Sequence, residues 1–142
     1  MPPPALLHHL VLTHAMRAAP ALKADGTVLA YARLAGDIEA FAAGLMNLAL
    51  PRGGRVAVWL DKRAETVIAC FGTAAAGGVF VPVNPVLKPA QVGHILRDSG
   101  AMALVTNAER LATLDDTLAT CPALAHVVLA PPPTRPPAHP AH

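Results

Sequence analysis

The stretch Gly77-Gly-Val-Phe-Val-Pro-Val-Asn-Pro85 decides the fold of this chain. Residues 79–83 are β-branched or aromatic and apolar on both faces, which is typical of a buried parallel strand covered by helices above and below. The two glycines end the preceding helix, because a left-handed residue costs least at a glycine. Pro82 and Pro85 end the strand, since neither can donate to a ladder. The chain then leaves toward the carboxyl end of the sheet, where ligands of open α/β proteins usually sit.

On the C-terminal side, helices and strands alternate. The pattern predicts helices over 63–76, 89–100 and 107–120, and strands over 55–60, 79–83, 101–106 and 126–130. Pro89 is a favoured first residue of a helix, and Asn107 and Asp61 are good caps for the helices that follow them. This order predicts an α/β fold with a mostly parallel sheet, right-handed crossovers and helices on its flanks.

The N-terminal side is predicted to differ. Residues 6–17 have a helical apolar face, and residues 21–24 and 27–30 flank Asp25-Gly26, a strong hairpin signal. A long amphipathic helix follows over 31–50, with an apolar stripe that includes Leu34, Ile38 and Leu45.

Length and composition suggest one domain, residues 1–130, followed by a Pro-rich tail, 131–142, which is predicted to be a linker or disordered. Hydrophobic residues make up 54% of the chain and charged residues 14%. Such a surface is normally covered by more protein. The net charge is only +2, the basic residues are scattered and aromatics are 4%, so we expect no nucleic-acid partner.

Cys70 and Cys121 lie far apart in the sequence, and Cys70 falls in an apolar helix, where a buried free thiol is expected. A disulfide framework is therefore not predicted, which favours a cytoplasmic protein without a signal peptide. Residues 66–87 carry no charge and are long enough to cross a bilayer, but glycines and prolines interrupt them. We predict no transmembrane segment.

Motifs for catalysis are mostly missing. Gly72-Thr-Ala-Ala-Ala-Gly77 has the glycine spacing of a phosphate loop, but Gly78 and Val79 stand where lysine and a hydroxyl residue are needed. The densest charged group is Asp61-Lys62-Arg63. It is either a cap with a solvated first helical turn or a contact to a phosphate-bearing ligand at the end of the strand.

The histidines and acidic residues do not form a metal site by their spacing. His8 and His9 point to different faces, and His14 is not one helical turn away from either. His94 and Asp98 have the spacing of a weak surface pair. Asp115-Asp116 is predicted to lie on an exposed helix face.

Several segments, in order and spacing, resemble the N-terminal part of AMP-forming acyl-CoA ligases, members of the adenylate-forming superfamily. The matching segments are Tyr31-Ala-Arg-Leu34, Ala43-Gly-Leu45, Gly54-Arg-Val-Ala-Val58, Ala76 to Pro85, His94 to Ser99 and Leu104-Val-Thr106. The resemblance covers about residues 6–130. Leu60-Asp-Lys-Arg63, Glu65-Thr66 and Val81-Pro-Val-Asn-Pro85 are particularly similar to bacterial ligases associated with exosortase and exopolysaccharide loci.

The resemblance implies that the chain is the N-terminal portion of the ligase large domain. The family uses ATP, Mg²⁺ and coenzyme A to turn a carboxylate into an acyl-adenylate and then a thioester. Its phosphate loop, nucleotide contacts, hinge and catalytic lysine lie downstream. We therefore assign no catalytic, cofactor-binding or metal residue here and expect no cofactor in this chain alone. Expected partners are the remainder of a ligase or a second copy.

Whether this chain is an enzyme stays open at this point. The alternative is a non-catalytic binding or interaction module that keeps the ligase scaffold. Two departures from the family pattern concern helix starts: Ala30 and Lys88 stand where a hydroxyl cap is usual, and each weakens a helix by about 1 kcal/mol.

Overall fold

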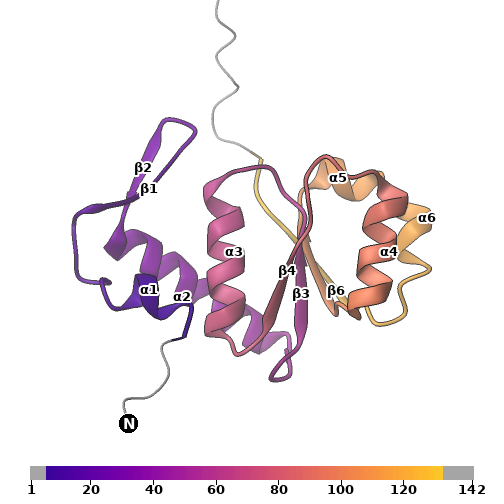
Figure 1. Ribbon diagram of the computed structural model, residues 1–142, viewed down its shortest axis with the longest axis horizontal. Coiled ribbons are helices and arrows are strands. Elements are labelled where there is room, and N and C mark those ends of the chain that lie inside the picture. The colour runs from indigo at the N-terminus through magenta and orange to yellow at the C-terminus, as the bar shows by residue number, and fades with distance from the viewer. Residues whose placement is uncertain (1–5, 133–142) are drawn as a thin grey trace, which may run out of the picture.

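The computed structural model describes residues 6–132 (Figure 1). In chain order the elements are α1 (His9–Leu12), β1 (Pro20–Ala24), β2 (Thr27–Ala30), α2 (Tyr31–Asn47), β3 (Arg55–Val58), α3 (Ala64–Ala75), β4 (Val79–Pro82), α4 (Pro89–Ser99), β5 (Ala103–Thr106), α5 (Ala108–Ala112), α6 (Asp115–Leu118) and β6 (His126–Leu129).

Four strands form one parallel sheet in the order β4-β3-β5-β6. The chain starts in the middle at β3, moves outward to β4, crosses back to β5 and ends at β6. The α/β fold with a parallel sheet flanked by helices is thus confirmed. All four strands end at the same edge of the sheet, as parallel strands must.

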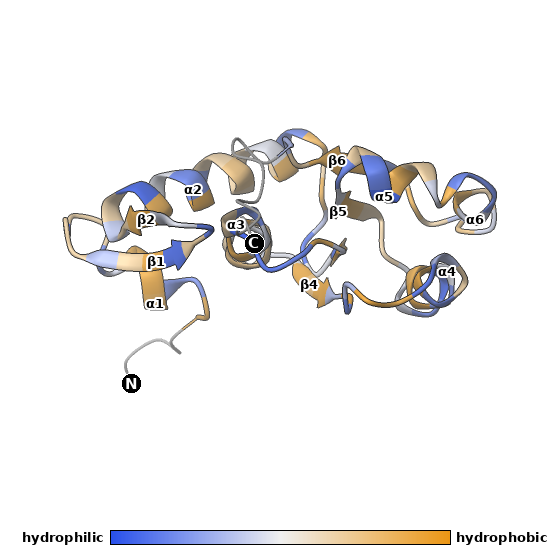
Figure 2. Ribbon diagram, turned by 90° about the horizontal axis from the view of Figure 1, so that it is seen from above, coloured by the Kyte–Doolittle hydropathy of each residue, from blue (hydrophilic) through white to orange (hydrophobic). Residues whose placement is uncertain are grey.

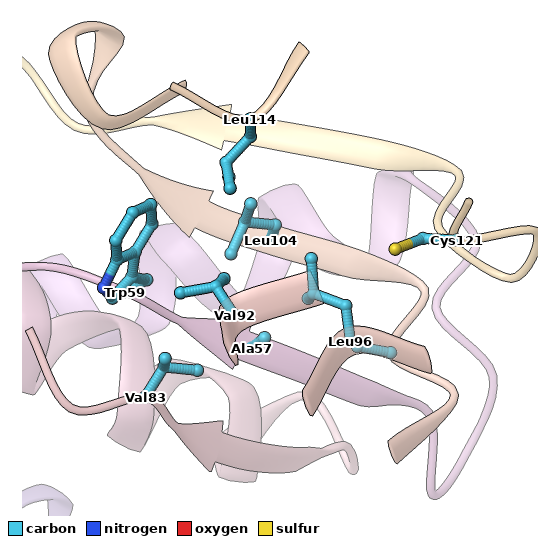
Figure 3. Close-up of a cluster of buried hydrophobic side chains, with 9 residues drawn as sticks. Ala57, Trp59, Val83, Val92, Leu96, Leu104, Leu114 and Cys121 are labelled. Carbon is cyan, nitrogen blue, oxygen red and sulfur yellow. The ribbon is translucent and has the colours of Figure 1, made fainter. Parts of the chain in front are cut away.

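Helices cover both faces of the sheet (Figure 2). On one face, α4 and the α5–α6 segment enclose a cluster around Ala57, Leu104 and Leu96 (Figure 3). On the other face, α3 and the end of α2 pack on Val56, Val58 and Val105. Residues 56–58 of β3 and 103–105 of β5 are therefore buried on both faces, which is why each of these stretches is apolar throughout.

The N-terminal part packs on the outer side of α2 and α3 instead of joining the sheet. The predicted hairpin is confirmed: β1 and β2 pair antiparallel, and Asp25 and Gly26 take φ values of 49° and 76°. Both central residues of a type I′ turn need this left-handed conformation.

The prediction of a buried strand over 79–83 is wrong in one respect. β4 is parallel but lies at the edge of the sheet, and Val79 is 49% exposed. The central places belong to β3 and β5. Since Pro82 cannot donate to a second neighbour, the edge is the place where this strand fits.

The two glycines before β4 have different roles. Gly77 has a φ of 81° and ends α3, as predicted. Gly78 is not left-handed but crowded: a β-carbon there would lie 2.9 Å from the Gly54 carbonyl oxygen and 2.9 Å from Leu50 Cδ2.

Two predicted helices are shorter than expected. The segment 107–120 breaks into α5 and α6, and the break lets Leu114 turn fully into the core. At the N-terminus only His9–Leu12 is helical, and the Thr13 hydroxyl donates to the His9 carbonyl oxygen (2.6 Å) as the helix ends. The pattern of apolar residues alone shows neither interruption.

The cluster on the α2–α3 face of the sheet extends to the partly buried Ala130. The predicted disordered tail falls largely on residues 133–142, which lie outside the described residues. Within residues 6–132, no helix is long and apolar enough to cross a membrane.

Candidate functional site

A cavity of about 360 Å³ lies at the carboxyl edge of the parallel sheet. Its walls come from the segment after β3, the segment that leads into α4, and α5. The lining residues are Trp59, Asp61, Leu87, Lys88, Pro89, Asn107, Glu109, Arg110 and Thr113. This is the edge at which open α/β sheets bind ligands.

Asn107 and Lys88 begin the helices that frame the cavity. Asn107 follows β5 directly, and its side-chain oxygen accepts a hydrogen bond from the Arg110 backbone N–H (2.8 Å), so the predicted cap is confirmed. Lys88 has no acceptor to offer. Its own backbone N–H donates to Gln91 Oε1 (2.9 Å), which supplies half of a capping box at the start of α4.

Arg110 is the central charged group of this edge. Its Nη2 donates to Asp61 Oδ1 (2.5 Å), and its Nη1 donates to the Pro85 carbonyl oxygen (2.9 Å). The guanidinium carbon lies 4.7 Å from the centroid of the Trp59 ring, a cation–π contact. One side chain on α5 thus ties together the segments that leave β3 and β4.

Trp59 lines the cavity and is 3% exposed. Its carbonyl oxygen accepts from the fully buried Thr106 hydroxyl (2.9 Å), which fixes the ends of β3 and β5 to each other. Within residues 6–132, Trp59 Nε1 has no hydrogen-bond partner. A buried donor without a partner carries a desolvation cost.

The charged group Asp61-Lys62-Arg63 is divided by the fold. Only Asp61 lines the cavity, and it does not cap α3: Arg63 holds that position without a side-chain cap. The predicted cap and the prediction of a solvated Arg63 in the first helical turn are both wrong. Arg63 Nε donates to Glu65 Oε2 (2.7 Å), and Nη2 donates to the Pro131 carbonyl oxygen (2.7 Å). Lys62 is exposed and does not line the cavity.

The Arg63–Glu65 pair shifts both groups in the expected directions. The hydrogen bond from Arg63 lowers the pKa of Glu65, although partial burial opposes this. The same bond raises the pKa of Arg63. Through its second bond, to the Pro131 carbonyl oxygen, Arg63 holds the chain after β6 against the beginning of α3.

The glycines of the phosphate-loop-like spacing are used for packing. A β-carbon on Gly72 would lie 2.6 Å from Phe41 Cδ1, so this glycine lets α3 approach α2 closely. Gly77 ends the helix. Gly72 and Gly77 therefore account for both ends of the motif without a phosphate.

The remaining candidate residues do not converge. His94 and Asp98 are both exposed, and the three ion pairs found among residues 6–132 do not include them. Asp115 and Asp116 are exposed in the first turn of α6, as expected. No group of three or more His, Cys, Asp or Glu side chains in the described part of the chain could hold a metal ion.

The structure corrects the prediction for Cys70. Cys70, predicted to be a core thiol, is only half-buried on the α2 side of the sheet, and this burial raises the pKa of its thiol. Cys121 is the buried one: its Sγ lies 3.5 Å from the Thr117 carbonyl oxygen. Both are free thiols.

Sequence reasoning missed Arg110. Its partners are 25 and 49 residues away along the chain, so no local pattern marks the contact. The available signal was its place in the first turn after the Asn107 cap. That turn directly follows a buried strand, at the edge where the β3 and β4 segments also emerge.

Known proteins resemble this chain in sequence. The model of the AMP-binding enzyme family matches residues 13–139. A long-chain-fatty-acid–CoA ligase of Escherichia coli is 36% identical over 111 residues, which cover 78% of this chain and 20% of the ligase. The corresponding ligase of Haemophilus influenzae is 39% identical over 97 residues, 68% of this chain and 17% of the ligase. The chain thus spans about a fifth of the length of these curated relatives.

Solved structures agree in fold. The anthranilate CoA ligase AuaEII, solved in complex with anthranoyl-AMP, superimposes with a TM-score of 0.81 at 25% identity, over 89% of this chain and 25% of the ligase. A benzoate CoA ligase from Burkholderia xenovorans superimposes with a TM-score of 0.79 at 20% identity, over 91% of this chain and 26% of the ligase.

The family match covers most of the chain, and the parallel sheet has the arrangement of these ligases. The chain belongs to the AMP-binding enzyme family, and it corresponds to the N-terminal region of its acyl-CoA ligases.

Proposed function

We propose that this chain supplies the N-terminal part of the large domain of an AMP-forming acyl-CoA ligase and has no adenylating activity by itself. The complete reaction joins a carboxylate to AMP with release of pyrophosphate, and then passes the acyl group to coenzyme A. The observation that carries the proposal is the family match over residues 13–139 in a chain that spans about a fifth of its relatives.

The chemistry supports inactivity of the isolated chain. Forming an acyl-adenylate needs donors around a triphosphate, a bound Mg²⁺ and positive charge on the transferring group. Arg110 and Arg63 are already held by carboxylates and backbone carbonyls. One oxygen of Asp61 is paired with Arg110, and in the described part of the chain Asp61 belongs to no group of three or more side chains that could hold a metal ion.

The test is pyrophosphate exchange with ATP and a panel of fatty and aromatic acids. We expect the purified chain to stay at background, alone and as the Lys62→Ala variant. Exchange by the isolated chain that is lost in Lys62→Ala would refute the proposal. Exchange that appears only after addition of a separately expressed remainder of a related ligase would identify one part of a split enzyme.

A non-catalytic module is the second candidate. It is favoured by the buried clusters, which fill both faces of the sheet from this chain's own residues. In this case the chain should unfold cooperatively and fail to restore exchange to any ligase remainder. A phosphate-loop sequence after His142 in the reading frame would instead support the ligase.

We also propose a bacterial, cytoplasmic protein of the subgroup associated with exosortase and exopolysaccharide loci. Support comes from Leu60-Asp-Lys-Arg63 and Val81-Pro-Val-Asn-Pro85. Neighbouring genes of another kind in the source genome would contradict this narrower assignment.

A further inference from the structure

The two edges of the parallel sheet differ in what they offer to another strand. At the β4 edge, the N–H groups of Val79 and Val83 donate inward to Gly54 and Val58. Along a parallel strand, the backbone groups of successive residues point alternately to the two neighbouring strands. The backbone groups of Phe80 and Pro82 therefore point outward, away from β3. Pro82 has no N–H, so this edge presents a single donor between Val79 and Val83. A proline at an outward position is a known protection against edge pairing.

Within β6 (His126–Leu129) no proline stands at an outward position, and the next outward position along the chain is Pro131. The N–H groups of His126 and Ala130 donate inward to Met102 and Thr106 of the β5 side. By the same alternation, Val127 and Leu129 direct their N–H and C=O groups outward. These two residues are 36% and 50% exposed. In Figure 2, β6 lies at the margin of the molecule, and no helix or strand of residues 6–132 lies beyond it.

We propose that the outer edge of β6 pairs with β6 of a second copy of this chain, in an antiparallel, two-fold symmetric contact. The spacing of the free groups supports this partner. With the axis at Val128, Val127 of one copy lies opposite Leu129 of the other. Each such pair exchanges two hydrogen bonds, so the contact uses both donors and both acceptors of each copy. The same surface serves both copies, as a two-fold interface requires.

The absence of charged residues near β6 is compatible with this pairing. A two-fold axis places like residues near one another, so a charged edge would repel itself. Residues 117–130 contain no Asp, Glu, Lys or Arg.

The test is the mass of the purified full chain in solution over a hundredfold range of concentration, by light scattering and sedimentation equilibrium. We expect the mass to rise from that of one chain, 14.6 kDa, to twice that value. Leu129→Pro removes an outward N–H and leaves the β5–β6 ladder intact, as Pro82 does on β4. Val127→Lys adds like charges near the axis. Both variants should stay single chains throughout.

Val79→Lys is the matched control, since it adds the same charge to an exposed valine at the other edge. It should associate like the unchanged chain. Circular dichroism and melting of all variants separate lost association from lost folding. A single chain at every concentration would overturn the proposal, and so would a dimer that Val79→Lys disrupts or that Leu129→Pro leaves unchanged. None of these outcomes depends on adenylating activity, so this inference stands apart from the proposed function.

Discussion

At the scale of single residues, Gly78 is a position that the packing leaves little room to change. The space for a β-carbon is already occupied on three sides by Gly54, Leu50 and Thr73. We expect Gly78→Val to destabilise the chain by roughly 1–3 kcal/mol, because the backbone of β3 and β4 would have to separate. Urea unfolding measures this. Gly44→Ala, on an open helix surface, is the control and should stabilise slightly. Unchanged stability of Gly78→Val would show that the site can relax.

Arg110 is the residue whose loss should loosen the carboxyl edge. We expect Arg110→Met to lower the free energy of unfolding by about 1–2 kcal/mol. Most of this loss comes from the missing bond to the Pro85 carbonyl oxygen and the missing contact with Trp59. The Asp61 pair adds little, because the Asp61 side chain is 70% exposed. Trp59 is the only tryptophan, so its fluorescence reports on this site directly.

In Arg110→Met the emission of Trp59 should shift to longer wavelength and become more open to quenching by iodide. Arg97→Met removes an exposed arginine whose side chain bonds Thr120 and should leave the emission unchanged. An unaltered Trp59 spectrum in Arg110→Met would contradict the arrangement.

The thiols should differ in reactivity. Cys121 is buried and should label only when the chain opens, so its rate should rise steeply with urea. Cys70 is half-buried, and burial raises its pKa. It should therefore label slowly at neutral pH and faster as the pH approaches that raised value. Mass spectrometry after a timed pulse of iodoacetamide identifies the modified cysteine. Faster labelling of Cys121 than of Cys70 would refute the assignment.

At the scale of elements, the beginning of α3 carries a pH-dependent contact. The bond from Arg63 lowers the pKa of Glu65 below its ordinary value of 4.5. Its folded pKa is thus below the unfolded one. The pair stabilises the fold above the unfolded pKa, and that stabilisation is lost as the pH falls through the folded value. The effect should stay under about 1 kcal/mol, since Glu65 is 36% exposed.

Glu65→Gln should therefore be less stable than the unchanged chain at neutral pH, and the two should converge in acid. Urea midpoints at both pH values test this. Asp37→Asn, in the exposed Arg33–Asp37 pair of α2, is the comparison. A constant difference between Glu65→Gln and the unchanged chain would show that the charge of Glu65 is not involved.

Elements with a local cause were predictable from the sequence. The Asp25-Gly26 hairpin, the start of α4 at Pro89 and its end at Gly100, with a φ of 65°, each depend on the backbone preferences of one or two residues. The edge position of β4 was not predictable in this way. It depends on which strand β5 pairs with, and that partner, β3, lies before β4 in the chain.

The candidate site was less predictable for the same reason. Asn107 could be named as a cap because its contact with Arg110 spans three residues. The bond between Arg110 and Asp61 joins residues 49 apart and exists only because β3 and β5 are neighbours. From the sequence alone, Asp61 and Arg63 were equally good candidates for a ligand contact. In the folded chain they have different partners, Arg110 and the Pro131 carbonyl oxygen.

At the scale of the whole molecule, protection of the backbone should follow the sheet. β3 and β5 are paired on both sides and covered on both faces, so their amides should exchange with solvent only by global unfolding. Within β6, exchange should alternate: the Val128 amide faces β5, whereas those of Val127 and Leu129 face outward. Amide-resolved hydrogen exchange by NMR in dilute solution should find both outward amides much faster than Val128. Raising the concentration should slow these two if copies pair through β6, and should leave β4 unchanged. Equal rates for all three residues in dilute solution would mean that another segment covers this edge, and that its N–H and C=O groups are not free to pair with a second copy.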